Sequence, residues 1–165
     1  MSLPAYMFLY DENGMLLNNG SAGLGREGAV EILSSSYGVS QPVDAYTGRI
    51  TGTRHHEPYI LHKDVDKLSP FLVVCVCEGR RLKKAEIRYY EINDAGIERE
   101  IYRVTMEGVV ITYVNANHTY IPGSNKHNMI ETVGLRYNSI EWLYLDGTIR
   151  YSDAWSKPLP VQEKK

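Results

Sequence analysis

The stretch that decides the fold is IEREIYRVTMEGVVITYVNA, residues 97–116, which is rich in β-branched and aromatic side chains and predicts one long β-strand. At about 3.3 Å per residue, a straight strand of this length would span roughly 66 Å. A compact domain of 165 residues has a radius of gyration of about 15 Å, so the strand must bend. Gly108 is the natural corner, because glycine accepts backbone angles that other residues avoid. Strands that bend in this way and pass between sheets are typical of barrels and sandwiches.

Further β-strands are predicted on both sides of this stretch. Turn signals at Asn13–Gly14 and Asp146–Gly147 close two of them, and the second signal predicts a two-residue hairpin turn. A change of phase near Asn138–Ser139 predicts a β-bulge. Pro58 favours an edge position for its own strand. The remaining predicted strands are Leu3–Tyr10, Ala29–Ser40, Thr53–His62 and Lys84–Ile92.

The segment SPFLVVCVCEG, residues 69–79, is predicted to be a short helix despite its many β-branched residues. Ser69 can cap the first turn, Pro70 suits the first helical position, and Gly79 suits the position after the last turn. Because the helix is apolar all round, it must be covered on more than one side, by the sheet and by a loop, a terminus or another subunit. We therefore expect a group of its apolar residues to be buried. They are Phe71, Leu72, Val73, Val74 and Val76.

The composition is that of an ordinary globular protein. The 165 residues are 43% hydrophobic and 23% charged, with a net charge of -2, which argues against a nucleic-acid-binding protein. No run approaches the length of a membrane span, and the first residues lack the pattern of a cleaved signal peptide. We expect one domain over residues 1–156, a flexible tail over residues 157–165, and synthesis and folding in the cytoplasm.

Several patterns that suggest chemical sites lack the surroundings that such sites need. GLGREG, with Gly23, Gly25 and Gly28, precedes a strand pattern rather than the helix that a dinucleotide site requires. In RHHEP the adjacent histidines would point to opposite faces of a strand and so could not share a metal ion. A possible metal set would be His55, His56, Glu57 and His62. Cys75 and Cys77 would point apart on a helix and are interpreted as small buried apolar residues. We therefore predict no cofactor, no metal and no enzymatic activity.

Several stretches together resemble the haemolysin-coregulated protein (Hcp) family, the tube protein of the bacterial type VI secretion system. They include MSLPAYMFLYDENG, REGAVEILSSSYGV, GTRHHEP, SPFL, INDAG and HNMIETVGLRYNSIEWLYLDGTIRYSDAW, in that order. The resemblance runs from Ser2 to Trp155. It implies a mainly β fold, a β-barrel of two packed antiparallel sheets with one short α-helix at the side.

The resemblance also implies a function. Members form a homo-hexameric ring, and rings stack into a tube that a contractile sheath drives out of the cell with a spike at its tip. Effector proteins ride in the pore. The resemblance thus implies a structural protein that is cytoplasmic when assembled, is secreted without a cleaved signal peptide and does not insert into a membrane.

One loop of this sequence corresponds to the family's protruding loop, which contacts the next ring. It is Gln41–Arg54, a polar segment with two glycines. The resemblance assigns ring stacking to Asp44, Tyr46, Thr47, Arg49 and Arg54.

Two other functions are compatible with a small β-protein. The first is a monomeric β-barrel that binds a small apolar molecule in its interior, although large inward side chains would fill that space. The second is an enzyme of unknown type. A ring and a monomeric binding protein differ in mass in solution, so the mass separates them.

Overall fold

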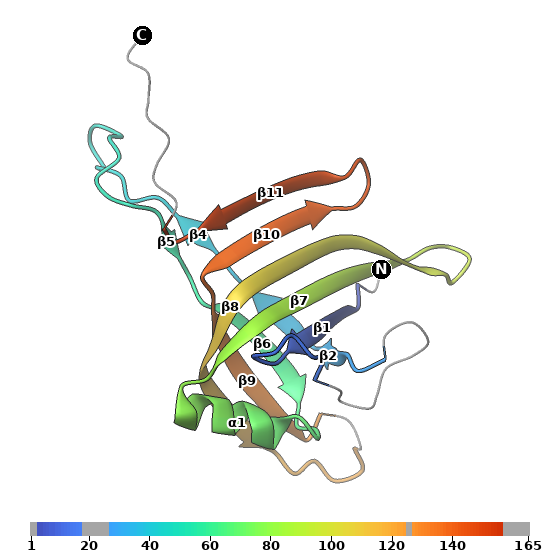
Figure 1. The fold of residues 1–165 in the computed structure, drawn as a ribbon. Helices are drawn as coiled ribbons and strands as arrows, with labels where there is room; N and C mark the ends of the chain where they lie inside the picture. Colours follow the sequence, from blue (N-terminus) through green and yellow to red (C-terminus); the bar gives the residue numbers. More distant parts are fainter. Residues whose placement is uncertain (1–2, 18–26, 125–126, 157–165) are drawn as a thin grey trace.

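The computed structural model describes residues 3–17, 27–124 and 127–156, and within these ranges it is a β-protein with one helix (Figure 1). The helix α1 (Ser69–Glu78) lies between β6 and β7. The strands are β1 (Ala5–Tyr10), β2 (Val30–Ile32), β3 (Ser34–Ser36), β4 (Val39–Ser40), β5 (His55–His56), β6 (Tyr59–Asp64), β7 (Arg81–Ile92), β8 (Glu98–His118), β9 (Met129–Arg136), β10 (Ser139–Tyr144) and β11 (Ile149–Ala154). This architecture confirms the predicted fold class. The predicted tail, residues 157–165, lies outside the described residues.

The large sheet follows the order β2-β1-β7-β8-β9-β6-β3, with every pair antiparallel. Its two ends are joined by one continuous piece of chain, residues 30–36. The first half of this piece pairs with β1 and the second half pairs with β6. Between them, the backbone N–H of Leu33 donates to the carbonyl of His62 at 2.8 Å. The path of paired strands therefore returns to its start, and the sheet forms a barrel.

The predicted corner at Gly108 is present, and it bends two strands together. Arg136 of β9 lies opposite Val110 and Ser139 of β10 lies opposite Glu107, so β9 and β10 follow the same edge of β8. Gly108 has φ 62°, and a Cβ there would lie 2.4 Å from Nδ2 of Asn138. The change of phase near Asn138 is thus the matching half of this corner, and β8 passes from the upper strands to the lower ones (Figure 1).

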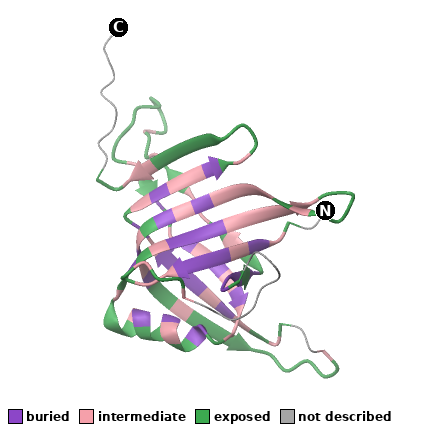
Figure 2. Cartoon of the chain, turned by 45° about the vertical axis from the view of Figure 1, so that its right-hand side comes forward, coloured by how far each residue is buried: buried purple, intermediate pink, exposed green. Residues whose placement is uncertain are grey.

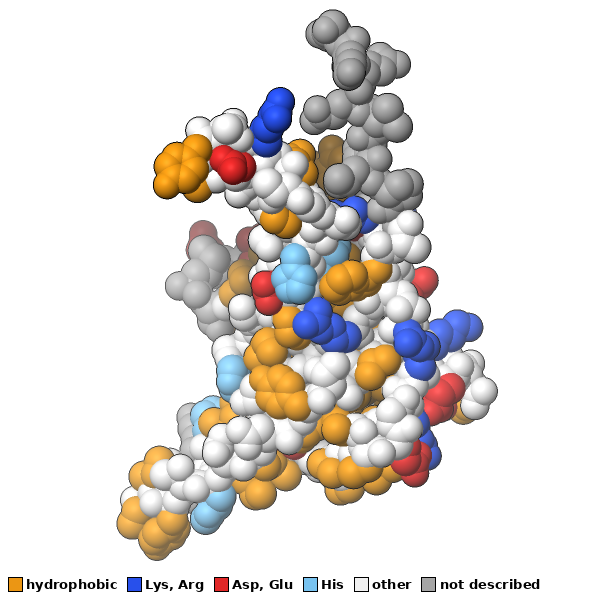
Figure 3. All heavy atoms as spheres, turned by 90° about the vertical axis from the view of Figure 1, so that its left-hand side faces the viewer, with side chains coloured by type: hydrophobic (Ala, Val, Ile, Leu, Met, Phe, Trp, Pro, Cys, Tyr) orange, Lys and Arg blue, Asp and Glu red, His pale blue; other side chains and the backbone are white. Residues whose placement is uncertain are grey.

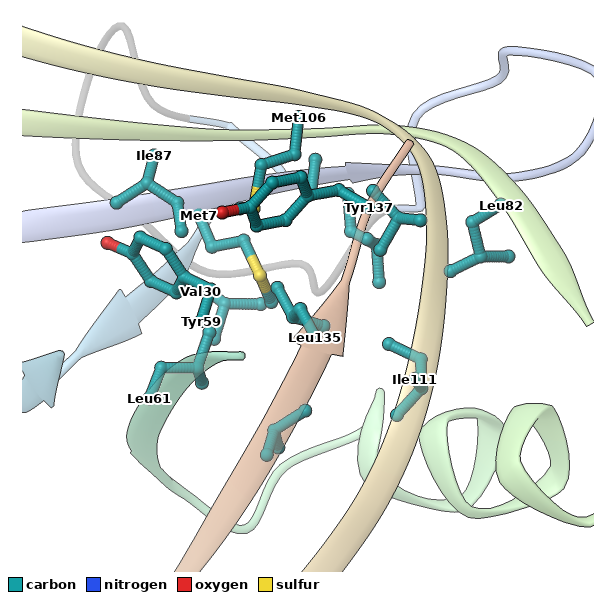
Figure 4. Close-up of a cluster of buried hydrophobic side chains, with 14 of the residues drawn as sticks. Met7, Val30, Tyr59, Leu61, Leu82, Ile87, Met106, Ile111, Leu135 and Tyr137 are labelled. Carbon is teal, nitrogen blue, oxygen red and sulfur yellow. The ribbon is translucent and has the colours of Figure 1, made fainter. Parts of the chain in front are cut away.

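The core fills the space between the two halves of the bent strands. Met106 and Ile111, on either side of the corner, are both almost fully buried. Figure 4 shows them pointing inward with Met7, Ile87 and Leu135 from three other strands. Other buried residues from all around the barrel include Leu9, Val30, Tyr59, Leu61, Leu82, Val104, Val109, Val133 and Ile140. A filled interior of this kind leaves the ends and outer faces of the barrel for function.

The helix ends where it was predicted to end, but its first turn differs from the prediction. Gly79 has φ 62° and its N–H donates back to carbonyls of the last turn, as the prediction required. Leu68, rather than Ser69, occupies the N-cap position. The hydroxyl of Ser69 is buried and hydrogen-bonds with the carboxylate of Glu131 at 2.7 Å, which explains why it does not cap the helix.

Two smaller predictions are also corrected. The loop between β10 and β11 has four residues, 145–148, because Tyr144 pairs with Ile149; Asp146–Gly147 is only its middle. Pro58 falls between β5 and β6, and β6 is paired on both sides, with β9 and β3. Proline therefore interrupts the predicted strand instead of marking a sheet edge.

Candidate functional site

The segment Gln41–Arg54 projects from one end of the barrel between β4 and β5 (Figure 1). Its two arms pair at Val43 and Ile50, and the backbone N–H of Asp44 donates to the carbonyl of Arg49 at 2.7 Å. Near the base, the side-chain amide of Gln41 donates to the carbonyl of Gly52 at 2.7 Å. These bonds make the loop a short, twisted hairpin extension of defined shape.

The turn at the end of this loop is held by the carboxylate of Asp44. Its Oδ1 accepts from the backbone N–H groups of Thr47 and Tyr46, both at 2.8 Å, and from the hydroxyl of Thr47 at 3.1 Å. The hydrogen bonds from Thr47 and Tyr46 lower the pKa of Asp44, because they stabilise the charged carboxylate. Gly48, with φ 69°, completes the turn. Asp44 and Thr47 therefore shape the loop from within.

The side chains that this turn presents outward are apolar and cationic. Tyr46 is 99% exposed, and Val43 and Ile50 are each about half exposed. The side chain of Arg49 is also exposed. Figure 3 shows hydrophobic and charged side chains together at this projecting end. Tyrosine side chains are enriched at protein interfaces, so an ordered turn with a fully exposed tyrosine has the composition of a contact surface.

Arg54, which the resemblance assigns to ring stacking, lies at the base of the loop. Its guanidinium forms a two-pronged ion pair with Asp153 of β11, and its NH2 group also donates to the carbonyl of Ala154 at 2.7 Å. Only 14% of the Arg54 side chain is exposed. Arg54 thus fixes the base of the loop to β11 within the subunit, instead of projecting with Tyr46 toward a neighbour.

A buried histidine completes this attachment. His56 is 1% exposed, and its ring nitrogens lie 2.8 Å from Oδ2 of Asp153 and 2.9 Å from the hydroxyl of Tyr137. Burial alone would raise the pKa of Asp153, but hydrogen bonds from Arg54 and His56 outweigh it and lower that pKa to about 2. Burial raises the pKa of Tyr137 to about 12. We call Arg54, His56, Tyr137 and Asp153 the loop anchor.

The helix residues expected to be buried divide into two groups. Leu72 is fully buried, and Phe71 and Val76 are partly buried and pack against the core. Val73 and Val74 are 46% and 39% exposed, so the prediction that they are buried is wrong for the single chain. Figure 2 shows that the helix carries both buried and exposed positions. The barrel covers one face of α1, and nothing in the described part of the chain covers the other.

A buried ion pair lies beneath the start of the helix. Lys63 and Glu131, on neighbouring strands, are paired with each other and are 0% and 1% exposed. The ammonium of Lys63 is also 3.1 Å from a carboxylate oxygen of Asp66, in the segment that leads into the helix. Charge pairs of this kind are costly to break, so they fix the helix to the barrel.

The histidines that could suggest a metal site make other contacts in the structure. The two adjacent histidines do point apart, since His55 is exposed beside Glu57 while His56 is buried. His62 hydrogen-bonds with Ser34 at 2.8 Å. Among the described residues, no group of three His, Cys, Asp or Glu side chains could hold a metal ion.

Two further predictions concern segments that the structure describes only in part. Gly23 and Gly25 of GLGREG lie outside the described residues, whereas Gly28 forms a turn just before β2. Cys75 is buried, and this burial raises the pKa of its thiol, but Cys77 is exposed, so it is not the buried apolar residue that was expected. No described helix is long and apolar enough to cross a membrane.

Sequence reasoning did not identify the loop anchor or the buried Lys63–Glu131 pair. Arg54 and His56 are two residues apart and so face the same side of an extended chain, where they can share one partner. Nothing local identifies that partner as Asp153, which is 99 residues away from Arg54 in the chain. Long-range pairs of this kind become visible only in the folded structure.

Three comparisons with known proteins find similarity to the same family over most of the chain. Residues 19–144 match the family model described as "Type VI secretion system effector, Hcp". The "Major exported protein" of Pseudomonas aeruginosa is 29% identical over 96% of this chain and 99% of its own length. A solved variant of Hcp1 from the E. coli EAEC 042 pathovar is 38% identical, with a TM-score of 0.83 over 93% of this chain and 99% of that one. Secreted protein Hcp3 from Pseudomonas aeruginosa shares the fold, with 24% identity and a TM-score of 0.75 over 94% and 100% of the two chains.

Proposed function

This chain belongs to the Hcp family of type VI secretion systems, and from that membership we propose that it is a ring-forming subunit of the secretion tube. The family consists of structural, secreted proteins that form hexameric rings in the tube, and it is not a family of enzymes. In the proposed role, copies of this chain close into a ring, rings stack into a tube, and effector proteins travel in the pore. The sheath and the spike of the same system are its further partners.

The observation that carries the proposal is the match over almost the whole chain to Hcp1, at 38% identity and a TM-score of 0.83. The surface of the single subunit supports it. Val73 and Val74 are exposed on an apolar helix, and among the described strands β11 pairs only with β10. Exposed apolar faces and open strand edges favour association, and a closed ring of identical copies would cover both.

The alternative, a monomeric barrel that binds a small molecule inside, has less support. Buried side chains from every part of the barrel occupy the interior, including Met7, Tyr59 and Leu135, which are all 0% exposed. A cavity of about 500 Å³ beside Tyr37 and Tyr102 is open to the surface and is not an enclosed ligand chamber. A ligand inside the barrel would have to displace packed core residues.

We also propose that the assembled protein is exported by the secretion system, without a cleaved signal peptide, from a cytoplasmic pool. The relative from Pseudomonas aeruginosa is described as a major exported protein, which supports this destination. In the native bacterium, the chain should reach the culture medium only when the contractile sheath is functional. Equal amounts in the medium with and without the sheath would contradict export by this route.

The mass in solution, together with negative-stain images, tests ring formation. Light scattering on a size-exclusion column should give a mass near six times 18.8 kDa, and the images should show annular particles. A mass of 18.8 kDa at every concentration would refute the ring and would favour the monomeric alternative. Arg49→Glu should reduce the stacking of rings and leave their mass unchanged, because Arg49 is exposed on the projecting loop.

A further inference from the structure

The loop 41–54 stands on a small sheet of its own. Within the described strands, β4 and β5 pair only with each other, through two residue pairs, and are not part of the large sheet. A two-stranded hairpin of this size is marginally stable by itself, so it defines the position of the loop poorly. Side chains at the base therefore have to fix the loop to the barrel.

The strongest of these contacts converge on the end of β11. The guanidinium of Arg54 pairs with Asp153 and donates to the carbonyl of Ala154 at 2.7 Å. A ring nitrogen of His56 lies 2.8 Å from the same Asp153, and the ring of Trp155 lies 5.4 Å from the ring of His56. Figure 1 shows the end of β11 beside β4 and β5. The base of the loop is thus attached to the last residues of one strand.

A second set of contacts holds the base at one residue only. Arg136, at the end of β9, donates to the carbonyl of His56 at 2.9 Å, and the hydroxyl of Tyr137 lies 2.9 Å from the ring of His56. A single fixed residue leaves the loop able to turn about it. The pair between Arg54 and Asp153 is the second point of attachment, and it sets the direction in which the loop projects.

The strand that supplies this second point is itself held from one side. Among the described strands β11 pairs with β10 alone, and none of its six residues is buried. Residues 149–152 are exposed, and Tyr151 is 72% exposed. A strand with one partner and little buried apolar surface belongs to the least stable parts of a fold and opens at a small cost. Asp153 has a fixed position only when β11 has one.

We propose that β11 couples ring closure to the position of the loop 41–54. A neighbouring copy that covers the open edge of β11 fixes this strand, Asp153 then fixes Arg54, and the loop projects in one direction. In a separate subunit β11 opens and closes, and the loop turns about His56. This inference rests on the proposed function, in which the ring covers β11, and it names what ring closure changes inside each subunit.

Coupling of this kind acts in both directions. If ring closure favours the fixed loop by some factor, the fixed loop favours ring closure by the same factor. Breaking the attachment at Arg54 should therefore weaken the ring, although Arg54 lies at the base of the loop and not on the open edge of β11. Subunits outside a ring, in turn, do not present a loop of fixed direction.

Hydrogen–deuterium exchange of the whole chain, read by mass spectrometry, tests the coupling. The native chain is compared in rings and as single subunits of 18.8 kDa, which are obtained by dilution or from Val73→Asp. Amides of β11 and of residues 54–57 should exchange at least about fivefold more slowly in rings. In rings of Arg54→Gln, β11 should keep its protection while residues 54–57 lose theirs. Amides of β1, which is paired on both sides, should exchange alike in every sample.

The concentration at which rings dissociate gives a second measurement. Arg54→Gln should raise it by at least about fivefold. Arg99→Gln is the matched control, because Arg99 also binds a carboxylate through two nitrogens, that of Glu91, but contacts neither the loop nor β11 in these bonds. It should leave the concentration unchanged. Asp153→Asn breaks the Arg54 pair from the other side and should match Arg54→Gln, which separates the coupling from a folding defect of one variant.

The outcomes separate this inference from the function on which it rests. Equal exchange of residues 54–57 in rings and in single subunits would overturn the inference while the ring remains. Full protection of these residues in Arg54→Gln rings would overturn it as well, because the loop would then be fixed without Asp153. A native chain that forms no rings would refute the proposed function and the inference together.

Discussion

The substitution Gly108→Ala tests whether the shared corner of β8 and the β9–β10 edge holds the fold together. Gly108 has φ 62°, a conformation that costs an alanine about 1–2 kcal/mol. The added Cβ would lie 2.4 Å from Nδ2 and 2.8 Å from Cγ of Asn138, so that side chain must move. Moving it disrupts the hydrogen bond from Arg81 to Oδ1 of Asn138, 2.9 Å long, which contributes about 1 kcal/mol. We therefore expect a total loss of about 2–3 kcal/mol.

Gly96→Ala is the matched control. Gly96 also has positive φ, 75°, but a Cβ there would meet nothing within 4 Å, so only the backbone cost of about 1–2 kcal/mol applies. Urea denaturation at one fixed protein concentration measures both variants, because association would otherwise shift the apparent stability. The variant at the corner should lose at least about 1 kcal/mol more than the control.

A double-mutant cycle identifies the clash itself. Asn138→Ala removes Nδ2 and Cγ, the two atoms nearest to the added Cβ. In that background Gly108→Ala should cost about 1 kcal/mol less than it does in the native chain. Equal losses for Gly108→Ala and Gly96→Ala, together with no coupling to Asn138, would refute the reasoning that packing at the corner, and not only backbone conformation, requires glycine.

Three further predictions concern the helix, the loop anchor and the buried ion pair. Leu72→Ala should lower the free energy of unfolding by about 3 kcal/mol, because Leu72 is fully buried. Val73→Asp, at a residue that is 46% exposed, should change the free energy of unfolding by under about 0.5 kcal/mol. It should instead reduce ring formation, which light scattering measures. The pKa of Asp153 is lowered to about 2 from 3.8, so its contribution to stability is present above pH 3.8 and is lost as the pH falls through about 2. Thermal melts should accordingly decline less over that pH range for Asp153→Asn than for the native chain or the control Asp146→Asn. Lys63→Ala should cost about 3 kcal/mol or more in urea denaturation, because it leaves a buried carboxylate unpaired; a loss under about 1 kcal/mol would show that the pair is not buried.

The features that the sequence predicted correctly are those that depend on local geometry. The corner at Gly108 follows from the length of a strand that has to fit a compact domain. The end of α1 follows from Gly79, because a left-handed residue there closes the last turn. The second argument needs only the residue and its neighbours, and the first needs in addition only the size of the domain.

The features that it missed depend on partners that are distant in the chain. Ser69 can cap a helix or bond a buried acid, and only the position of Glu131 decides between the two. An apolar helix such as α1 must be covered, but composition does not say whether its own chain covers Val73 and Val74. The pairing of Arg54 with Asp153 was missed for the same reason, since Asp153 belongs to β11, far along the chain.

In the proposed role, the projecting loop has to combine a precise position with a weak contact. The anchor of Arg54, His56 and Asp153 supplies the position, because it ties the base of the loop to β11. The proposed contact would be weak, because one turn with a single fully exposed tyrosine covers far less than the roughly 1,200 Å² of a stable interface. In a hexameric ring such as the family forms, six of these contacts would form together, so once one had formed the others would become effectively intramolecular. A small loss in each contact, as in Arg49→Glu, would then be multiplied across the ring, so one substitution in the loop should have a large effect on stacking.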